Sequence, residues 1–299
     1  MTVRSDLLVL AAAAIWGVAF FFQKTAMDHV DALTFVAARG ALACVTLLPF
    51  AFWEVRRSGW PSRAMLAGAA ISGTIFFVAS WVQQLGISQT TVINTGLLTV
   101  IYVAAAPCLF WWLRRERPGA NIWVGVGFVS MGVLALSGGV PVAFGLGDAL
   151  VAGAALFWAL HLVVMGELGA HGRPLTLTML QFLTVAVIAT PLAAGWGTTS
   201  RPDLMLALPD LLYVGVLSSA LTFALMATAL QRIPASRGAV LLSSEVVFST
   251  AAGVLLLGEW LTWLGWLGAA LIVCGVIVVR SGSVPVPSSP DRPEAPRDP

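Results

Sequence analysis

The chain has 299 residues, of which 59% are hydrophobic and only 10% are charged, and its mean hydropathy is +0.91. A soluble domain carries roughly 25% charged residues, so this chain cannot cover its apolar surface in water, and its surroundings are expected to be lipid. The net charge of +2 is too small to indicate a nucleic-acid partner.

Ten predominantly apolar runs follow one another along the chain, each near the length of about 20 residues that crosses a bilayer. In order, they are Leu7–Thr25, Ala32–Trp53, Ala64–Leu85, Thr91–Leu113, Ile122–Ser137, Asp148–Gly166, Leu175–Gly195, Asp210–Leu230, Gly238–Leu257 and Thr262–Arg280. The sequence therefore predicts an all-α membrane protein with ten transmembrane helices.

The ten runs fall into two copies of one unit. At an offset of 142, Asp6, Trp16 and Pro49 match Asp148, Trp158 and Pro191; at 143, Glu116, Gly125 and Gly132 match Glu259, Gly268 and Gly275. Two such patches at nearly the same offset indicate a tandem duplication, with units at 6–140 and 148–280. The first run follows Arg4 as a signal peptide would, but its counterpart is internal, so both are expected to be membrane helices.

Lysine and arginine mark one side of the membrane. Arginines follow the second, fourth, sixth, eighth and tenth runs, whereas the opposite loops carry little more than Lys24 and Arg201. The positive-inside rule then places both termini in the cytoplasm. Five spans is an odd number, so the second unit enters the membrane upside down, as in the inverted repeats of many secondary transporters. The proline-rich segment 281–299 is expected to be a disordered cytoplasmic tail.

Several motifs in both halves resemble those of the EamA-type members of the drug/metabolite transporter superfamily. They are A-A-A-A-I-W-G-V-A-F in the first run, L-T-F-V-A-A-R-G in the second, G-L-L-T-V-I-Y-V-A-A-A-P in the fourth, and S-S-E-V-V-F and G-E-W-L near the ninth and tenth. The resemblance covers about residues 6–280. It implies ten helices around a central cavity and movement of small metabolites by alternating access, but it implies no particular substrate. The second unit departs from the first where Gln181 replaces Arg39 and Glu245 replaces Tyr102.

Ionisable residues inside the runs are candidates for function, because a charge at the centre of a helix costs about 2.5–3.5 kcal/mol on insertion scales. Glu245 lies eight residues beyond Arg237, which is about 12 Å along a helix. It could couple protons or bind an ammonium group, or it could be a structural acid satisfied by Ser243, Ser244 or an arginine. Arg39 could bind an anionic group or pair with an acid for stability.

The sequence gives weaker support for a functional role of the other polar and aromatic residues. His161 suits proton relay, although a lone histidine hydrogen-bonded within a bundle is the commoner outcome. Trp16, Trp81, Tyr102 and Trp158 could form an aromatic cavity wall. The substrate-binding or coupling residues predicted from the sequence are Glu245, Arg39, Tyr102, His161, Trp16, Trp158 and Gln181.

The favoured function is a secondary transporter in the plasma or inner membrane, moving a small metabolite or drug-like solute, with export and proton coupling as further expectations. The alternative is an intramembrane enzyme acting on a lipid-linked substrate, which would need a convergent set of catalytic groups. A channel is disfavoured because it needs a continuous polar pore. The sequence shows no cofactor motif or zinc spacing, and its three cysteines lie far apart in apolar runs.

Overall fold

The computed structural model describes residues 2–90, 92–136, 145–168, 172–257 and 262–281, and every regular element in these ranges is a helix. The first unit holds α1 (Thr2–Ala26), α2 (Ala32–Ser58), α3 (Arg63–Ile87), α4 (Val92–Thr99), α5 (Ile101–Arg114) and α6 (Ala120–Leu136). The second holds α7 (Leu146–Leu168), α8 (Pro174–Trp196), α9 (Arg201–Leu206), α10 (Leu208–Leu212), the π-helix η2 (Tyr213–Leu221), α11 (Thr222–Leu230), α12 (Ala235–Leu242), α13 (Glu245–Leu257) and α14 (Trp263–Ser281). The expected tail beyond Ser281, and Glu259, lie outside the described residues.

Within these ranges, eight helical segments are long and apolar enough to cross a membrane, and two further apolar helices, Ala120–Ala135 and Trp263–Val279, are shorter. Three of the predicted runs consist of more than one helical element in the structure. The fourth is divided into α4 and α5, the eighth into α10, η2 and α11, and the ninth into α12 and α13. Hydropathy averaged over a run cannot reveal such changes, because the few polar residues at them, such as Ser243 and Ser244, are averaged with many apolar neighbours.

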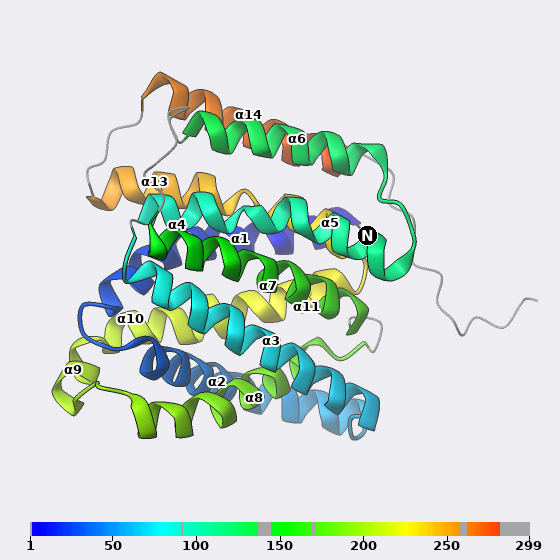
Figure 1. Cartoon of the computed structure of the whole chain (residues 1–299). Coiled ribbons are helices and arrows are strands. Elements are labelled where there is room, and N and C mark those ends of the chain that lie inside the picture. The colour runs from blue at the N-terminus through cyan, green and yellow to red at the C-terminus, as the bar shows by residue number, and fades with distance from the viewer. Residues whose placement is uncertain (1, 91, 137–144, 169–171, 258–261, 282–299) are drawn as a thin grey trace, which may run out of the picture.

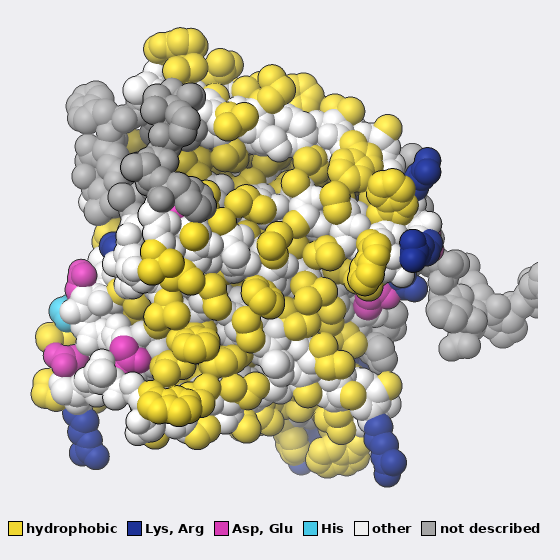
Figure 2. Space-filling view, in the orientation of Figure 1, with side chains coloured by type: hydrophobic (Ala, Val, Ile, Leu, Met, Phe, Trp, Pro, Cys, Tyr) yellow, Lys and Arg dark blue, Asp and Glu magenta, His cyan; other side chains and the backbone are white. Residues whose placement is uncertain are grey.

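The helices form one bundle with a pair at each edge (Figure 1). α6 and α14 pack against each other along one edge, and α2 packs against α8 along the opposite edge. α1 lies between them and contacts α11, α12 and α13, while α7 contacts α3, α4 and α5. Apolar side chains cover the middle of the visible surface, and charged side chains gather toward its two ends, as expected of a protein that crosses a bilayer (Figure 2).

Glycines allow the helices at the centre and at the α6/α14 edge to touch. A methyl group at Gly132 would lie 2.7 Å from the carbonyl oxygen of Gly268, and one at Gly275 would lie 2.9 Å from that of Gly125. A methyl group at Gly17 would lie only 2.6 Å from the carbonyl oxygen of Glu245. These close approaches are the small-residue packing typical of membrane helices, and the last one brings α1 against the start of α13.

Hydrogen bonds join α2 to α8 at one end and to the residues that follow α8 at the other. At one end, Asp31 caps α2 through the Thr34 amide at 3.0 Å and accepts hydrogen bonds from the Thr198 and Thr199 amides, at 2.9 and 3.2 Å. Burial alone would raise the pKa of Asp31, but hydrogen bonds from Thr199, Thr34 and Thr198 outweigh it and hold the pKa at about 2. At the other end, Glu54 accepts hydrogen bonds from the amide and hydroxyl of Thr176 at 2.7 and 2.6 Å, which caps the first turn of α8.

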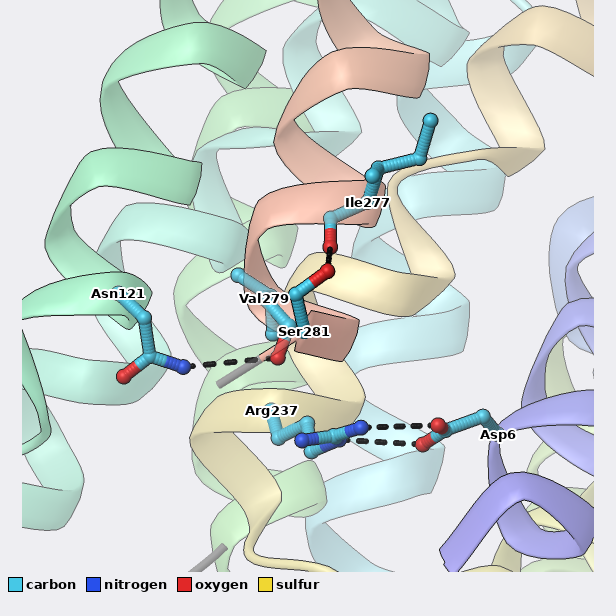
Figure 3. Close-up of polar contacts among 6 residues, drawn as sticks. All are labelled: Asp6, Asn121, Arg237, Ile277, Val279 and Ser281. Carbon is cyan, nitrogen blue, oxygen red and sulfur yellow. Dashed lines mark hydrogen bonds and ion pairs between the residues drawn. The ribbon is translucent and has the colours of Figure 1, made fainter. Parts of the chain in front are cut away.

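A buried ion pair joins α1 to α12 (Figure 3). The Arg237 Nη2 and Nε atoms donate to the two carboxylate oxygens of Asp6 at 2.8 and 3.1 Å. Asp6 is 1% exposed and Arg237 is 3% exposed, and all eight residues of α12 are buried. The sequence interpretation of Arg237 as a loop charge was therefore wrong, because its guanidinium is turned inward onto a carboxylate 231 residues away in the chain.

Candidate functional site

A buried cavity lies where the interrupted helices meet α1, α2, α3 and α7. About 60 Å³ of it is open to the centres of water-sized molecules, several times what one water needs. Its apolar lining is Trp16, Phe20, Trp158, Leu162, Phe223, Met226 and Leu242, and its polar lining is Gln23, Arg39, Gln83, Thr99, Tyr102, His161, Ser218 and Glu245. A mainly apolar wall with a few convergent polar groups is the usual form of a small-solute site.

Two of the polar lining residues, Tyr102 and Glu245, lie just after helix breaks. α4 ends at Thr99 and α5 begins at Ile101, while α12 ends at Leu242 and α13 begins at Glu245. Thr99 and Leu242 are 143 positions apart, which is the offset between the two sequence units. The Tyr102 hydroxyl and the Glu245 carboxyl are both buried, and the two groups interact with each other across the two breaks. Broken helices of this kind line the solute sites of many transporters.

The break before Glu245 has a local cause. The hydroxyls of Ser243 and Ser244 donate to the carbonyl oxygens of Val240 and Leu241 at 2.6 and 2.8 Å. Serine hydroxyls that bind nearby carbonyls in this way compete with the helical pattern. These two hydroxyls, which were named among the groups that could satisfy the Glu245 carboxyl, are thus bonded to backbone carbonyls, and the hydroxyl that interacts with Glu245 is that of Tyr102.

Arg39 is held in place by hydroxyl groups and aromatic rings. Its Nε atom donates to Ser219 Oγ at 3.0 Å, and its Nη1 atom donates to Ser80 Oγ at 3.1 Å. The guanidinium carbon lies 5.2 Å from the centre of the Phe76 ring and 5.8 Å from that of Phe35, within the range of cation–π attraction. Arg39 forms no ion pair with any residue in the described ranges. Of the two alternatives that the sequence left open for Arg39, the pairing with an acid is thus not seen in these ranges.

The equivalent tryptophans of the two units both border the cavity, but different groups orient them. Trp16 Nε1 donates to the Ser218 carbonyl in η2 at 2.7 Å. Trp158 Nε1 donates to Gln83 Oε1 at 3.1 Å, and Gln83 Nε2 in turn donates to Thr99 Oγ1 at 2.9 Å. π-Helical turns are frequent at functional sites, and here the same turn supplies the partners of both Trp16 and Arg39.

His161 borders the cavity on one side and is hydrogen-bonded behind it on the other. Gln181 Oε1 lies 2.8 Å from His161 Nε2 and accepts a hydrogen bond from Ser72 Oγ, also at 2.8 Å. The Gln181 side chain therefore joins His161 to Ser72. Gln181 is fully buried and is not part of the lining, so it acts on the cavity through His161.

Six of the seven predicted site residues border the cavity, and only Gln181 lies behind it. Trp81, expected in the aromatic wall, is not among the lining residues and stacks on Phe77 at 5.8 Å between ring centres. The sequence reasoning did not select Phe20, Gln23, Gln83, Thr99, Ser218 or Phe223 for the site. Adjacent serines in the apolar stretch V-L-S-S-A-L were a usable signal for Ser218 and its neighbour, since polar groups at membrane depth tend to be functional.

Comparison with known proteins identifies the family of the chain and supports its fold. The EamA-like transporter family matches the chain twice, at residues 3–138 and 145–281. An uncharacterized transporter of Archaeoglobus fulgidus is 28% identical over 276 residues, covering 92% of this chain and 85% of that protein. The threonine/homoserine exporter RhtA of Escherichia coli K12 is 27% identical over 279 residues, covering 92% and 88%. One crystal structure, with 15% identity, superposes with a TM-score of 0.73 over 92% of this chain and 95% of the other, which supports the fold alone.

Proposed function

Since the chain belongs to the EamA-like transporter family, we propose that it is a secondary transporter that moves a small metabolite or drug-like solute through this cavity by alternating access. The family and the named relatives are transporters and not enzymes, so the intramembrane enzyme is set aside. The chain is a multi-pass membrane protein, and both termini are assigned to the cytoplasm on the distribution of loop arginines.

One observation carries the proposal. Arg39 and Glu245, two residues of opposite charge, border the same buried cavity, and neither forms an ion pair within the described ranges. Because charges at this depth are costly, they are retained where they serve a solute or a proton. Glu245 is assigned the coupling role, since a carboxyl in contact with the cavity can exchange a proton for a solute at the same place.

Ten spans in two inverted units, 6–140 and 148–280, are the second part of the proposal. The offset of 143 converts Gly125 into Gly268 and Gly132 into Gly275. The contact of Gly132 with Gly268 therefore maps onto the contact of Gly275 with Gly125, as a two-fold relation between the units requires. The 17 residues of α6 and 19 of α14 suffice for a short span.

Export is the proposed direction. The support is the name of the Escherichia coli and Salmonella relatives, a threonine/homoserine exporter, together with the matching of the family over nearly the whole chain. The same name suggests L-threonine as the first solute to test.

Exchange across vesicles tests alternating access. Vesicles containing the purified protein and loaded with unlabelled L-threonine are expected to take up labelled L-threonine several-fold faster than empty vesicles, because a loaded carrier returns faster than an empty one. Vesicles without protein are the control. Equal protein-dependent uptake into loaded and empty vesicles would indicate a pore and contradict alternating access.

Thiol labelling tests the orientation. In a variant without Cys44, Cys108 and Cys274, single cysteines at the exposed positions Ser88 and Ser200 are expected to react with an impermeant reagent in intact cells. Cysteines at Ser58 and Ala120, also exposed, are expected to react only after lysis. Labelling of Ser58→Cys in intact cells would reverse the orientation, and labelling of Ser58→Cys and Ser88→Cys from one side would refute the number of spans between them.

A further inference from the structure

The helices close more tightly over one end of the cavity than over the other. α4 and α12 occupy equivalent places in the two units, because their last residues, Thr99 and Leu242, are 143 positions apart. All eight residues of α12 are buried, whereas Val92, Leu97 and Leu98 of α4 are only partly buried. The tighter end is the one at which α1 and α12 begin, and it is the cytoplasmic end in the proposed orientation.

The cavity lining toward this end is also the more apolar. Met226 of α11 and Leu242 of α12 border the cavity there. At the offset of 143 they correspond to Gln83 and Thr99, which border it toward the other end. Passage from the cavity to the cytoplasmic end requires α12 to move, because its side chains are buried along its whole length.

The ion pair of Asp6 and Arg237 holds α12 against α1 (Figure 3). Arg237 lies five positions before Leu242, which is about 7.5 Å along a helix, so the pair and the cavity are at opposite ends of α12. The helix is bounded by Pro234 before its first residue and by Ser243 after its last. A short helix between two non-helical joints can turn as one piece, as the hinged elements of other proteins do.

Closure at this end leaves several polar groups poorly satisfied. Ser5 Oγ and Gln231 Nε2 are buried without a hydrogen-bond partner in the described part of the chain. Ser5 directly precedes Asp6, and Gln231 lies in the turn between α11 and α12. The buried charges themselves gain little net free energy, because their lost hydration offsets their attraction. Water would satisfy all of these groups if α1 and α12 separated, so this contact is suited to open and close.

We propose that the Asp6–Arg237 pair is the gate that closes the cavity toward the cytoplasm, and that the pair separates when α12 turns away from α1 to open that side. This inference rests on the proposed function and specifies how one side of the cavity is closed. Neither residue lines the cavity, so both act on transport through the position of α12. The two charges make closure reversible, because each is hydrated in the open form.

Removing one charge or both is expected to move the gate differently. In Arg237→Met, the Asp6 carboxylate lacks its counter-charge when the gate is closed but is hydrated when it is open, so the open form is favoured. Asp6→Asn combined with Arg237→Met leaves no charge to hydrate, so closure is restored. A pH of 8 keeps Asp6 from relieving its burial by taking up a proton.

The rate of thiol labelling inside the cavity measures the opening. The probe is Leu162→Cys, a lining position toward the cytoplasmic end, in a variant without the three native cysteines. A small charged methanethiosulfonate reagent is added to the cytoplasmic face of inverted membrane vesicles. Labelling is expected to be accelerated by about tenfold or more in Arg237→Met, and to be no faster in the double variant than in the unmodified pair.

Controls separate opening of the gate from loss of structure. Ala189→Cys, a fully buried position of α8 outside the lining, reports unfolding and is expected to stay unlabelled. Arg114→Met, which breaks an exposed ion pair, is expected to leave labelling of Leu162→Cys unchanged. Asp6→Asn, which leaves Arg237 without its counter-charge, takes the place of Arg237→Met if that variant does not insert. Unchanged labelling of Leu162→Cys, or equal acceleration at Ala189→Cys, in these single variants overturns the proposal.

Labelling from the outside separates this inference from the proposed function. Phe20→Cys, at the position equivalent to Leu162, borders the cavity toward the other end. If access alternates, its labelling in intact cells falls in Arg237→Met. Faster labelling of Leu162→Cys with no fall at Phe20→Cys retains the gate and refutes alternating access. Exchange of solute across vesicles, together with unchanged labelling of Leu162→Cys, retains the transporter and refutes the gate.

Discussion

Replacing Arg237 with methionine is expected to lower the free energy of unfolding by about 3–5 kcal/mol, because it removes the positive charge that is paired with the buried Asp6 carboxylate. Both side chains are almost fully enclosed, and two hydrogen bonds join them. Water cannot replace the lost charge at this position unless α1 and α12 separate. Thermal and denaturant unfolding of the purified protein in detergent, followed by tryptophan fluorescence, measures the loss.

Matched variants separate the buried charge from other effects of the substitution. Asp6→Asn combined with Arg237→Met removes both charges and is expected to recover most of the lost stability, since uncharged groups of similar size often replace a buried pair at little cost. Arg114→Met breaks the ion pair with Glu167, whose side chains are 53% and 37% exposed, and is expected to cost less than about 1 kcal/mol. A loss for Arg237→Met no larger than that for Arg114→Met would show that the buried pair contributes nothing special.

The membrane class and six of the fifteen residues that line the cavity were predictable from the sequence, because both depend on the lipid surroundings of the chain. In a chain with so few charges, each ionisable residue within an apolar run requires a polar surrounding, and Arg39, His161 and Glu245 do border one cavity. The duplication added the tryptophans, since Trp16 and Trp158 recur at the same place in each unit. Composition and spacing were sufficient for these residues.

The residues that hold the site together were not predictable, because their contacts join distant segments. Ser219 meets Arg39 across 180 positions, and Ser218 meets Trp16 across 202. Gln181, by contrast, was predicted as a site residue but does not line the cavity. It occupies the position equivalent to Arg39, but its shorter, neutral side chain bonds to Ser72 and His161 and does not reach the lining. Equivalence of position in a repeat fixes the backbone environment and leaves the reach and charge of the side chain open.

Glu245→Gln is expected to abolish the response of transport to a pH gradient while the protein still folds and inserts. Glutamine keeps the size of the side chain and removes the group that exchanges a proton. The group that interacts with the Glu245 carboxyl is the Tyr102 hydroxyl, and the amide oxygen of glutamine can still accept a hydrogen bond from it. The expected structural cost is therefore small, and Glu167→Gln, which changes a partly exposed acid outside the cavity lining, serves as the matched control.

The size of the effect follows from the coupling itself. If one proton is exchanged for one solute molecule, a gradient of one pH unit stores about 1.4 kcal/mol and supports about a tenfold concentration ratio of solute across the vesicle membrane. The unmodified protein and Glu167→Gln are expected to approach that ratio for L-threonine, whereas Glu245→Gln is expected to reach a ratio of about one. The amount of labelled solute retained in the vesicles at steady state measures this concentration ratio. A Glu245→Gln protein that still accumulates solute tenfold would show that the proton moves through another group, and His161, the remaining histidine on the cavity, would be the next to replace.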